Sequence, residues 1–176
     1  MDFTCPDPKA TVRAANVRAT LDAFRLLPEL GRRIVERHEL SVDDLRPDAW
    51  ILVQRWLDAL KEIQGAVGPA KVREVGRLVV ENADIPPIGT EALLLALDQV
   101  YYQNHRGDVG HYRTTRIDDG SIEVRCETPY PRHFEWGLID GFCGPQCAGS
   151  SRYSVEYIEG PPGGDHTCTL TVRKLG

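Results

Sequence analysis

The sequence predicts an α+β domain in which an N-terminal helical layer packs on a four-stranded antiparallel sheet with ββαββ order. Apolar residues recur every three or four positions through the first hundred residues, which is typical of amphipathic helices. After about residue 107 the polarity alternates instead, which is typical of strands. The 176 residues contain no low-complexity linker, and a chain of this length can bury one hydrophobic core. We therefore expect a single domain over residues 1–176, with a mainly helical layer at 1–106 and the sheet region at 107–176.

Five helices are expected before the sheet region, because five segments each carry an apolar stripe at helical spacing. Pro28 interrupts the first stripe, and Pro69 suits the first turn of the fourth helix. Thr90 is the expected N-cap of the fifth helix. The expected helices are residues 10–27, 29–38, 50–67, 69–83 and 90–101.

Two pairs of strands with a helix between them are expected after residue 107. Asp118-Asp119-Gly120 joins the first pair, since Gly supplies the positive φ of a tight turn. Apolar residues at Phe134, Leu138 and Phe142 indicate the helix. The expected strands are residues 110–117, 121–127, 152–159 and 167–174, and the expected helix is residues 132–143.

Composition excludes some classes of function. The chain has 21 Lys and Arg against 26 Asp and Glu, a net charge of −5, which disfavours a protein that holds nucleic acid by neutralising phosphates. No apolar run reaches the ~18 residues of a membrane span. The first residues have neither the basic nor the apolar part of a secretory signal, so we expect a cytoplasmic protein with no nucleic-acid or membrane partner. Five cysteines, an odd number, favour reduced thiols or a metal site over a disulfide framework.

Four segments of the second half follow one another in a recognisable order. They are a helix that includes Leu97–Gly107, a hairpin that closes with Cys126–Pro131, a helix with two glycines four residues apart at Phe134–Phe142, and Val155–Tyr157 followed by Gly164–Cys168. In these segments the chain resembles the four-vinyl-reductase-type, or hydrocarbon-binding, sensor domains. Haem nitric-oxide-binding domains and the Bet3-like subunits of transport-protein particles belong to the same superfamily. The resemblance covers about half of the chain.

The resemblance implies a pocket between sheet and helices that binds a small hydrophobic ligand or cofactor, in a sensory or regulatory domain that forms a homodimer. The aromatic residues agree with this, because aromatic rings line apolar pockets while phenol and imidazole groups orient one polar group of a ligand. We therefore predict a single ligand-binding domain whose partner is a small hydrophobic molecule. The candidate ligand- or cofactor-binding residues are Tyr101, Tyr102, His105, Tyr130, Phe134 and Trp136.

A haem-binding gas sensor is the alternative that the resemblance offers. In the haem nitric-oxide-binding domains a histidine on the helix before the hairpin ligates the iron, and aligning Leu97-Asp98 puts Tyr101 at that position, with His105 one turn later. Tyrosinate can also ligate ferric haem. The Tyr-x-Ser-x-Arg stretch that binds the haem propionates in that family has no counterpart around Val124–Pro129.

Zinc is a second cofactor that the resemblance raises, since some relatives hold it with cysteines and a glutamate. The corresponding positions here are Arg132, Glu156, Glu159 and Cys168. A guanidinium does not ligate zinc, and the two matching residues are fewer than a usual site requires. Our hypothesis is that this zinc site is lost and that Arg132 pairs with Glu156 or Glu159.

Two further classes of function stay open at this stage. A small enzyme with a cysteine nucleophile would use Cys126, His133 and Asp140, or Cys168 with His166, and a metal-dependent one could use Cys143 and Cys147 as ligands. No motif fixes the geometry of these residues. An adaptor without any small ligand, as the transport-particle resemblance suggests, would have an interior filled by side chains.

Overall fold

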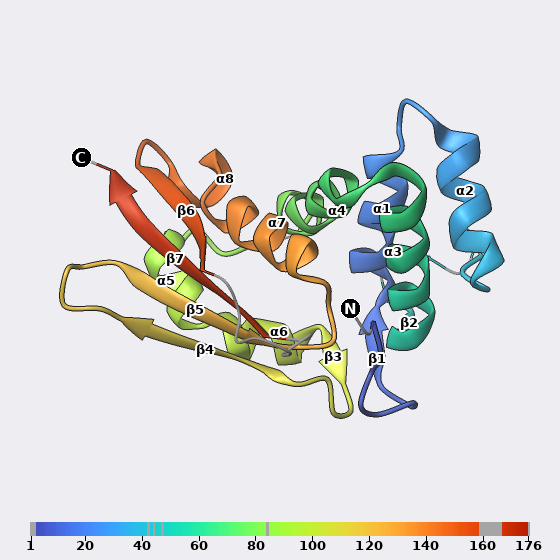
Figure 1. The fold of residues 1–176 in the computed structure, drawn as a ribbon, viewed down its shortest axis with the longest axis horizontal. Coiled ribbons are helices and arrows are strands. Elements are labelled where there is room, and N and C mark those ends of the chain that lie inside the picture. The colour runs from blue at the N-terminus through green and yellow to red at the C-terminus, as the bar shows by residue number, and fades with distance from the viewer. Residues whose placement is uncertain are drawn as a thin grey trace.

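The computed structural model describes residues 3–41, 43, 45–46, 48–83, 85–158 and 167–175. It confirms the α+β class: helices dominate the first hundred residues, and a four-stranded antiparallel sheet follows. Figure 1 shows this sheet at one end of the molecule and α1, α2 and α3 at the other, with α4 and α7 between them. No helix within the described ranges is both long and apolar enough to cross a membrane.

The N-terminal half contains strands that the helical stripes did not predict. Its elements are β1 (Thr11–Arg13), α1 (Ala14–Ala23), α2 (Pro28–Arg37), β2 (Trp50–Leu52), α3 (Val53–Val67) and α4 (Pro69–Glu81). The helices expected at 10–27 and 50–67 each begin as a three-residue strand. β1 pairs antiparallel with β2 and with β3 (His105–Arg106), which gives a small sheet of order β2-β1-β3. Three residues are too few to display a two-residue period, so the helical stripe concealed these strands.

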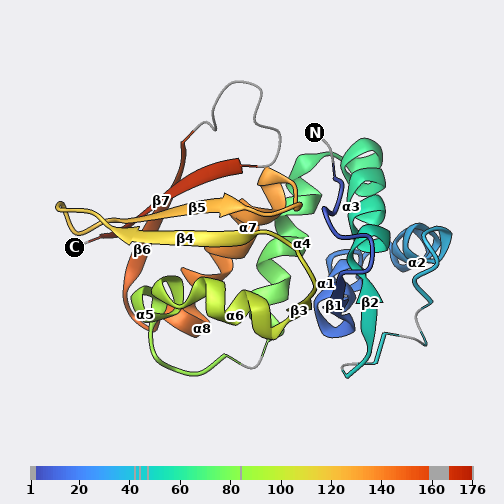
Figure 2. The same cartoon turned by 90° about the horizontal axis from the view of Figure 1, so that it is seen from below.

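The helix expected at 90–101 is two helices, α5 (Thr90–Leu95) and α6 (Leu97–Gln103), which lie alongside β4 (Figure 2). Ala96 separates them with φ −97° and ψ 8°. The expected N-cap was wrong, because Gly89 holds that position with a φ of 89°. The hydroxyl of Thr90 instead donates to the carbonyl of Phe142 at 2.7 Å, a contact between distant segments that overrides the local preference.

The larger sheet consists of β4 (His111–Arg116), β5 (Ile122–Glu127), β6 (Arg152–Ile158) and β7 (Thr167–Leu175). Its spatial order is β4-β5-β7-β6, and all neighbours are antiparallel. The hairpin turn has Gly120 at φ 81°, as the turn sequence requires. The chain passes through α7 (Arg132–Phe142) and the short α8 (Pro145–Ala148) between β5 and β6. The glycine- and proline-rich residues 160–165, which the sequence predicts as the loop between the last two strands, lie outside the described residues.

α4 and α7 touch backbone to backbone through two glycines. A Cβ at Gly76 of α4 would lie 2.1 Å from the carbonyl oxygen of Phe134, and one at Gly137 of α7 would lie 1.9 Å from that of Arg73. Only a residue without a side chain permits such an approach. α7 therefore joins the sheet to the helices, and its apolar face supplies one wall of the pocket described next.

Candidate functional site

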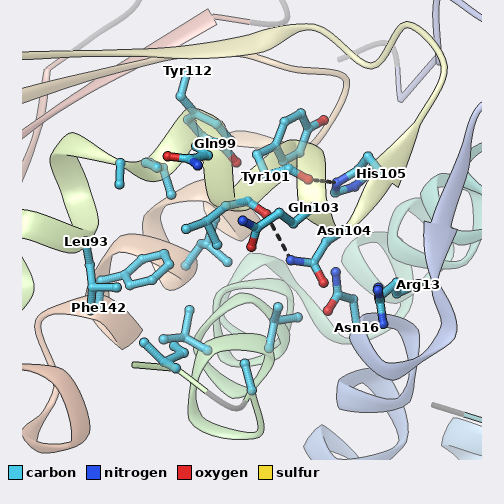
Figure 3. A pocket seen from close by; sticks show the side chains of 18 of the residues that line it. Arg13, Asn16, Leu93, Gln99, Tyr101, Gln103, Asn104, His105, Tyr112 and Phe142 are labelled. Atoms are coloured by element: carbon cyan, nitrogen blue, oxygen red, sulfur yellow. Dashed lines mark hydrogen bonds between the residues drawn. The ribbon is translucent and has the colours of Figure 1, made fainter. Parts of the chain in front are cut away.

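A pocket of about 560 Å³ lies between the α5–α6 segment, α4, α7 and the start of α1 (Figure 3). This volume is within the range of small-molecule sites. Leu93 and Phe142 lie at one end of the pocket, while Arg13, Asn16 and Asn104 gather at the other (Figure 3). An adaptor without a small ligand would have an interior filled by side chains, and this pocket does not agree with that expectation.

Four of the six candidate residues line this pocket. They are Tyr101, His105, Tyr130 and Phe134. Tyr102 is 47% exposed and its hydroxyl donates to the carbonyl of Gly110 at 2.8 Å. Trp136 stacks on Tyr157 and has the guanidinium of Arg73 at 3.8 Å from its ring centroid. Both lie outside the pocket lining, because residues one or two positions along a helix face different directions.

His105 has its two ring nitrogens in defined hydrogen bonds. Nδ1 lies 2.9 Å from the carbonyl oxygen of Tyr101, and Nε2 lies 2.7 Å from the hydroxyl of Tyr130. Burial lowers the pKa of His105 from 6.5 to about 4, so the ring is neutral near pH 7. A carbonyl only accepts, so Nδ1 carries the proton and Nε2 accepts from Tyr130. The imidazole therefore presents the Nε2 lone pair with the ring orientation fixed by the backbone.

The tyrosines around His105 are protonated phenols. The hydroxyl of Tyr101 donates to the carbonyl of Val109 at 2.8 Å, and burial raises the pKa of Tyr101 and of Tyr130 well above 10. Tyr130 also stacks on Phe134 and meets the edge of Trp56. Tyr101 is therefore a neutral phenol that already donates to Val109, whereas Nε2 of His105 has a lone pair on a neutral ring, so His105 is the better candidate ligand.

A buried carboxyl group adjoins the pocket through Tyr112. The hydroxyl of Tyr112, a lining residue, donates to Oε2 of Glu135 at 2.6 Å, and the hydroxyl of Thr128 donates to Oε1. Burial raises the pKa of Glu135 from 4.5 to about 7. Sequence reasoning missed this residue, although a signal existed: Glu135 shares the apolar stripe of Leu138 and Phe142 at helical spacing.

The residues at the polar end of the pocket were also not predicted from the sequence. The backbone N–H of Arg13 donates to the carbonyl of Asn104 at 3.0 Å, so the pairing of β1 with β3 brings these distant residues together. The side-chain amide of Asn104 donates to the carbonyl of Val100 at 2.9 Å. Trp56 of α3 was likewise not anticipated as a lining residue. No local pattern in the sequence marks any of these residues as part of a site.

The residues considered for zinc lie away from the pocket. Arg132 lies over the ring of Tyr157, 6.0 Å from its centroid, and makes no ion pair with Glu156 within the described part of the chain. Cys168 faces Cys126 directly across β7 and β5. The described ranges contain no group of three or more His, Cys, Asp or Glu able to hold a metal ion. Glu159 lies outside those ranges.

The residues considered for cysteine catalysis are engaged elsewhere. Burial raises the pKa of the Cys126 thiol well above 9 and that of Cys143 to about 12, which disfavours the reactive thiolate. Asp140 pairs with Arg73 at 2.6 Å. His133 has a buried Nδ1 without a hydrogen-bond partner in the described structure, and His166 lies outside it.

The helical cap, the antiparallel sheet and the pocket define the class of the protein: an α+β domain with a pocket of the size of small-molecule sites. No protein-family model matches the sequence, and a search of curated proteins finds no relative.

Solved structures identify the particular fold as that of H-NOX domains. An H-NOX protein from S. oneidensis in the Fe(II)NO ligation state is 11% identical, with 93% of this chain and 99% of that chain covered and a TM-score of 0.69. The F78L variant of Tt H-NOX is 16% identical, with 93% and 95% covered and a TM-score of 0.69. An oxygen-binding H-NOX domain related to soluble guanylate cyclases is 16% identical, with 92% of each chain covered and a TM-score of 0.66. At these identities the likeness shows the fold, and the finer four-vinyl-reductase or Bet3-like assignment stays a prediction.

Proposed function

We propose that residues 1–176 form one sensory domain that binds haem in the pocket, with His105 as the ligand of the iron, and that the domain responds to a small gas molecule. The observation that carries this proposal is the neutral, buried imidazole of His105, whose Nε2 is an acceptor on the pocket wall. The similar H-NOX structures include one with ligated Fe(II)NO and one in an oxygen complex, which supports the same kind of ligand here.

The residues of the pocket fit a haem group in three respects. Neutral imidazole is a common metal ligand, and a backbone carbonyl on Nδ1 is the usual contact that orients such a ligand. The walls near Leu93, Leu138 and Phe142 are apolar, as the macrocycle requires. Arg13 supplies a positive charge at the polar end of the lining. A haem group held by these residues would supply an iron able to bind a diatomic gas.

Tyr130 sets a condition on this function. Its hydroxyl occupies the lone pair of Nε2, so His105 becomes a ligand only when that hydrogen bond opens. The phenol ring is held by its stacking on Phe134 and by the edge of Trp56. Tyr130 therefore competes with any metal for Nε2.

A second candidate is a sensor that binds a small hydrophobic molecule without iron. The observation in its favour is that Nε2 of His105 already has a partner, and that Tyr101 donates to Val109 from the position where the resemblance expects a histidine. The same pocket then provides apolar walls and two phenol groups for a ligand. Homodimerisation and a cytoplasmic location stay predictions from the sequence.

Titration of the full chain with hemin tests the proposal. We expect the wild-type protein to shift and sharpen the Soret band at one equivalent, and His105→Ala to lose this spectrum. His111→Ala removes a half-exposed histidine outside the pocket and serves as the control, with far-UV circular dichroism to confirm that each variant folds. Absence of a Soret shift in the wild type, or an unchanged spectrum in folded His105→Ala, would contradict the proposal. Binding of a hydrophobic dye without hemin binding would favour the second candidate.

A further inference from the structure

Among the described residues that line the pocket, the formally charged one is Arg13. The described part of the lining contains no Asp or Glu, although the whole chain has more acidic than basic residues. The buried carboxyl of Glu135 is hydrogen-bonded to Tyr112 and Thr128 and is not part of the lining. A site of this composition disfavours cationic ligands and accepts neutral or anionic ones.

Polarity also changes along the pocket. Figure 3 shows Arg13 beside Asn16 and Asn104 at one end, and Leu93 and Phe142 at the other. A ligand that fills the pocket thus meets polar groups at one end and apolar side chains along the rest of its length.

Arg13 is held at this end by both its backbone and its side chain. Its N–H donates to the carbonyl of Asn104, and its guanidinium lies 5.4 Å from the ring centroid of Trp50. Arg106 stacks on the same ring at 3.8 Å, which adds a second positive charge nearby. Within the described ranges neither guanidinium forms an ion pair with a carboxylate. Within that part of the chain Arg13 has no carboxylate partner, so its guanidinium can pair with an anion that enters the pocket.

We infer that the pocket selects ligands with an apolar body and one anionic end, and that Arg13 binds the anionic end. This inference rests on the proposed function, since it names the class of ligand for the same pocket. A carboxylate of haem and the carboxylate of a haem-free hydrophobic acid share this chemistry, so the inference holds for both candidate functions.

A matched pair of fluorescent probes tests the inference with the full chain. N-phenyl-1-naphthylamine is neutral, and 8-anilino-1-naphthalenesulfonate has the same rings with one added sulfonate. We expect Arg13→Gln to weaken binding of the sulfonate about twofold to fivefold, the range for losing one ion pair at an exposed site, and to leave binding of the neutral probe unchanged. Arg13→Lys should restore part of the loss.

Two controls make the result specific. Arg18→Gln removes the same charge from an exposed position of α1 outside the lining, and we expect it to leave both affinities unchanged. Val100→Trp fills the pocket from a half-buried position, and we expect it to abolish binding of both probes.

Three outcomes would overturn the inference. If Arg13→Gln and Arg18→Gln have equal effects on binding of the sulfonate probe, or neither has an effect, then Arg13 does not bind the anionic end. Binding of the neutral probe would in that case leave the proposed function intact. Binding that Val100→Trp does not reduce would place the probes outside the pocket. Failure of both probes and of hemin to bind would remove the proposed function as well.

Discussion

Replacing Tyr130 by Phe tests whether this residue restrains His105. The substitution keeps the ring that stacks on Phe134 and removes the hydroxyl that donates to Nε2 at 2.7 Å. Without that donor, Nε2 is a buried acceptor with no partner, which costs about 1–3 kcal/mol of unfolding free energy. We therefore expect Tyr130→Phe to lower the urea midpoint with an unchanged m-value.

The same substitution should strengthen hemin binding. Wild-type protein breaks the Tyr130–His105 hydrogen bond before Nε2 can bind a metal, and a neutral hydrogen bond has a net value of about 0.5–1.5 kcal/mol. Its removal should tighten hemin binding by about twofold to tenfold. Titration of the variant and of wild-type protein, followed by the Soret absorbance, measures the difference.

Tyr101→Phe is the matched control for this experiment. It removes a buried hydroxyl that donates to Val109 and leaves the contact at Nε2 in place. We expect a loss of stability without a gain in hemin affinity. If Tyr130→Phe folds but binds hemin no more tightly than Tyr101→Phe does, then the hydroxyl of Tyr130 does not compete with a metal for His105.

Two further predictions concern stability. Burial raises the pKa of Glu135 from 4.5 to about 7, so the folded state holds the proton of this carboxyl more tightly than the unfolded state does. The unfolding free energy should therefore fall by on the order of 3 kcal/mol as pH rises from about 4.5 to 7. Urea unfolding across this window should show that fall in wild type and a smaller one in Glu135→Gln; parallel curves would refute the assignment. Gly137→Ala should destabilise the protein by several kcal/mol, since its Cβ would meet the carbonyl of Arg73. Gly65→Ala, where a Cβ meets nothing within 4 Å inside α3, should instead stabilise it by about 0.5–1 kcal/mol, and equal effects of the two would contradict the packing argument.

The β4–β5 hairpin and α7 were predictable because their signals are local. Alternating polarity and a turn glycine define the hairpin, and a stripe of apolar residues defines α7. The break between α5 and α6 was not predictable, because Ala96 is a strong helix former and the interruption depends on tertiary contacts. The strands β1 and β2 were not predicted for a different reason, because their few residues pair with partners far along the chain.

The residues of the candidate site also divide into those that the sequence predicted and those that it did not. Tyr101 and His105 are four positions apart, so the sequence predicts that they lie close together; in the structure α6 ends at Gln103 and His105 lies in β3, where its Nδ1 still contacts the carbonyl of Tyr101. Arg13 and Trp56 line the pocket from elements whose position depends on the whole fold. The sequence contains their chemistry but not their proximity, since β1 must first pair with β3 to bring Arg13 beside Asn104.

The position of His105 links two parts of the molecule. This residue is a wall of the pocket and is also a member of β3, where it faces Val12 of β1. One residue beyond β1's last position, the chain becomes α1. His105 therefore connects the pocket directly to the strand that leads into the amino-terminal helices.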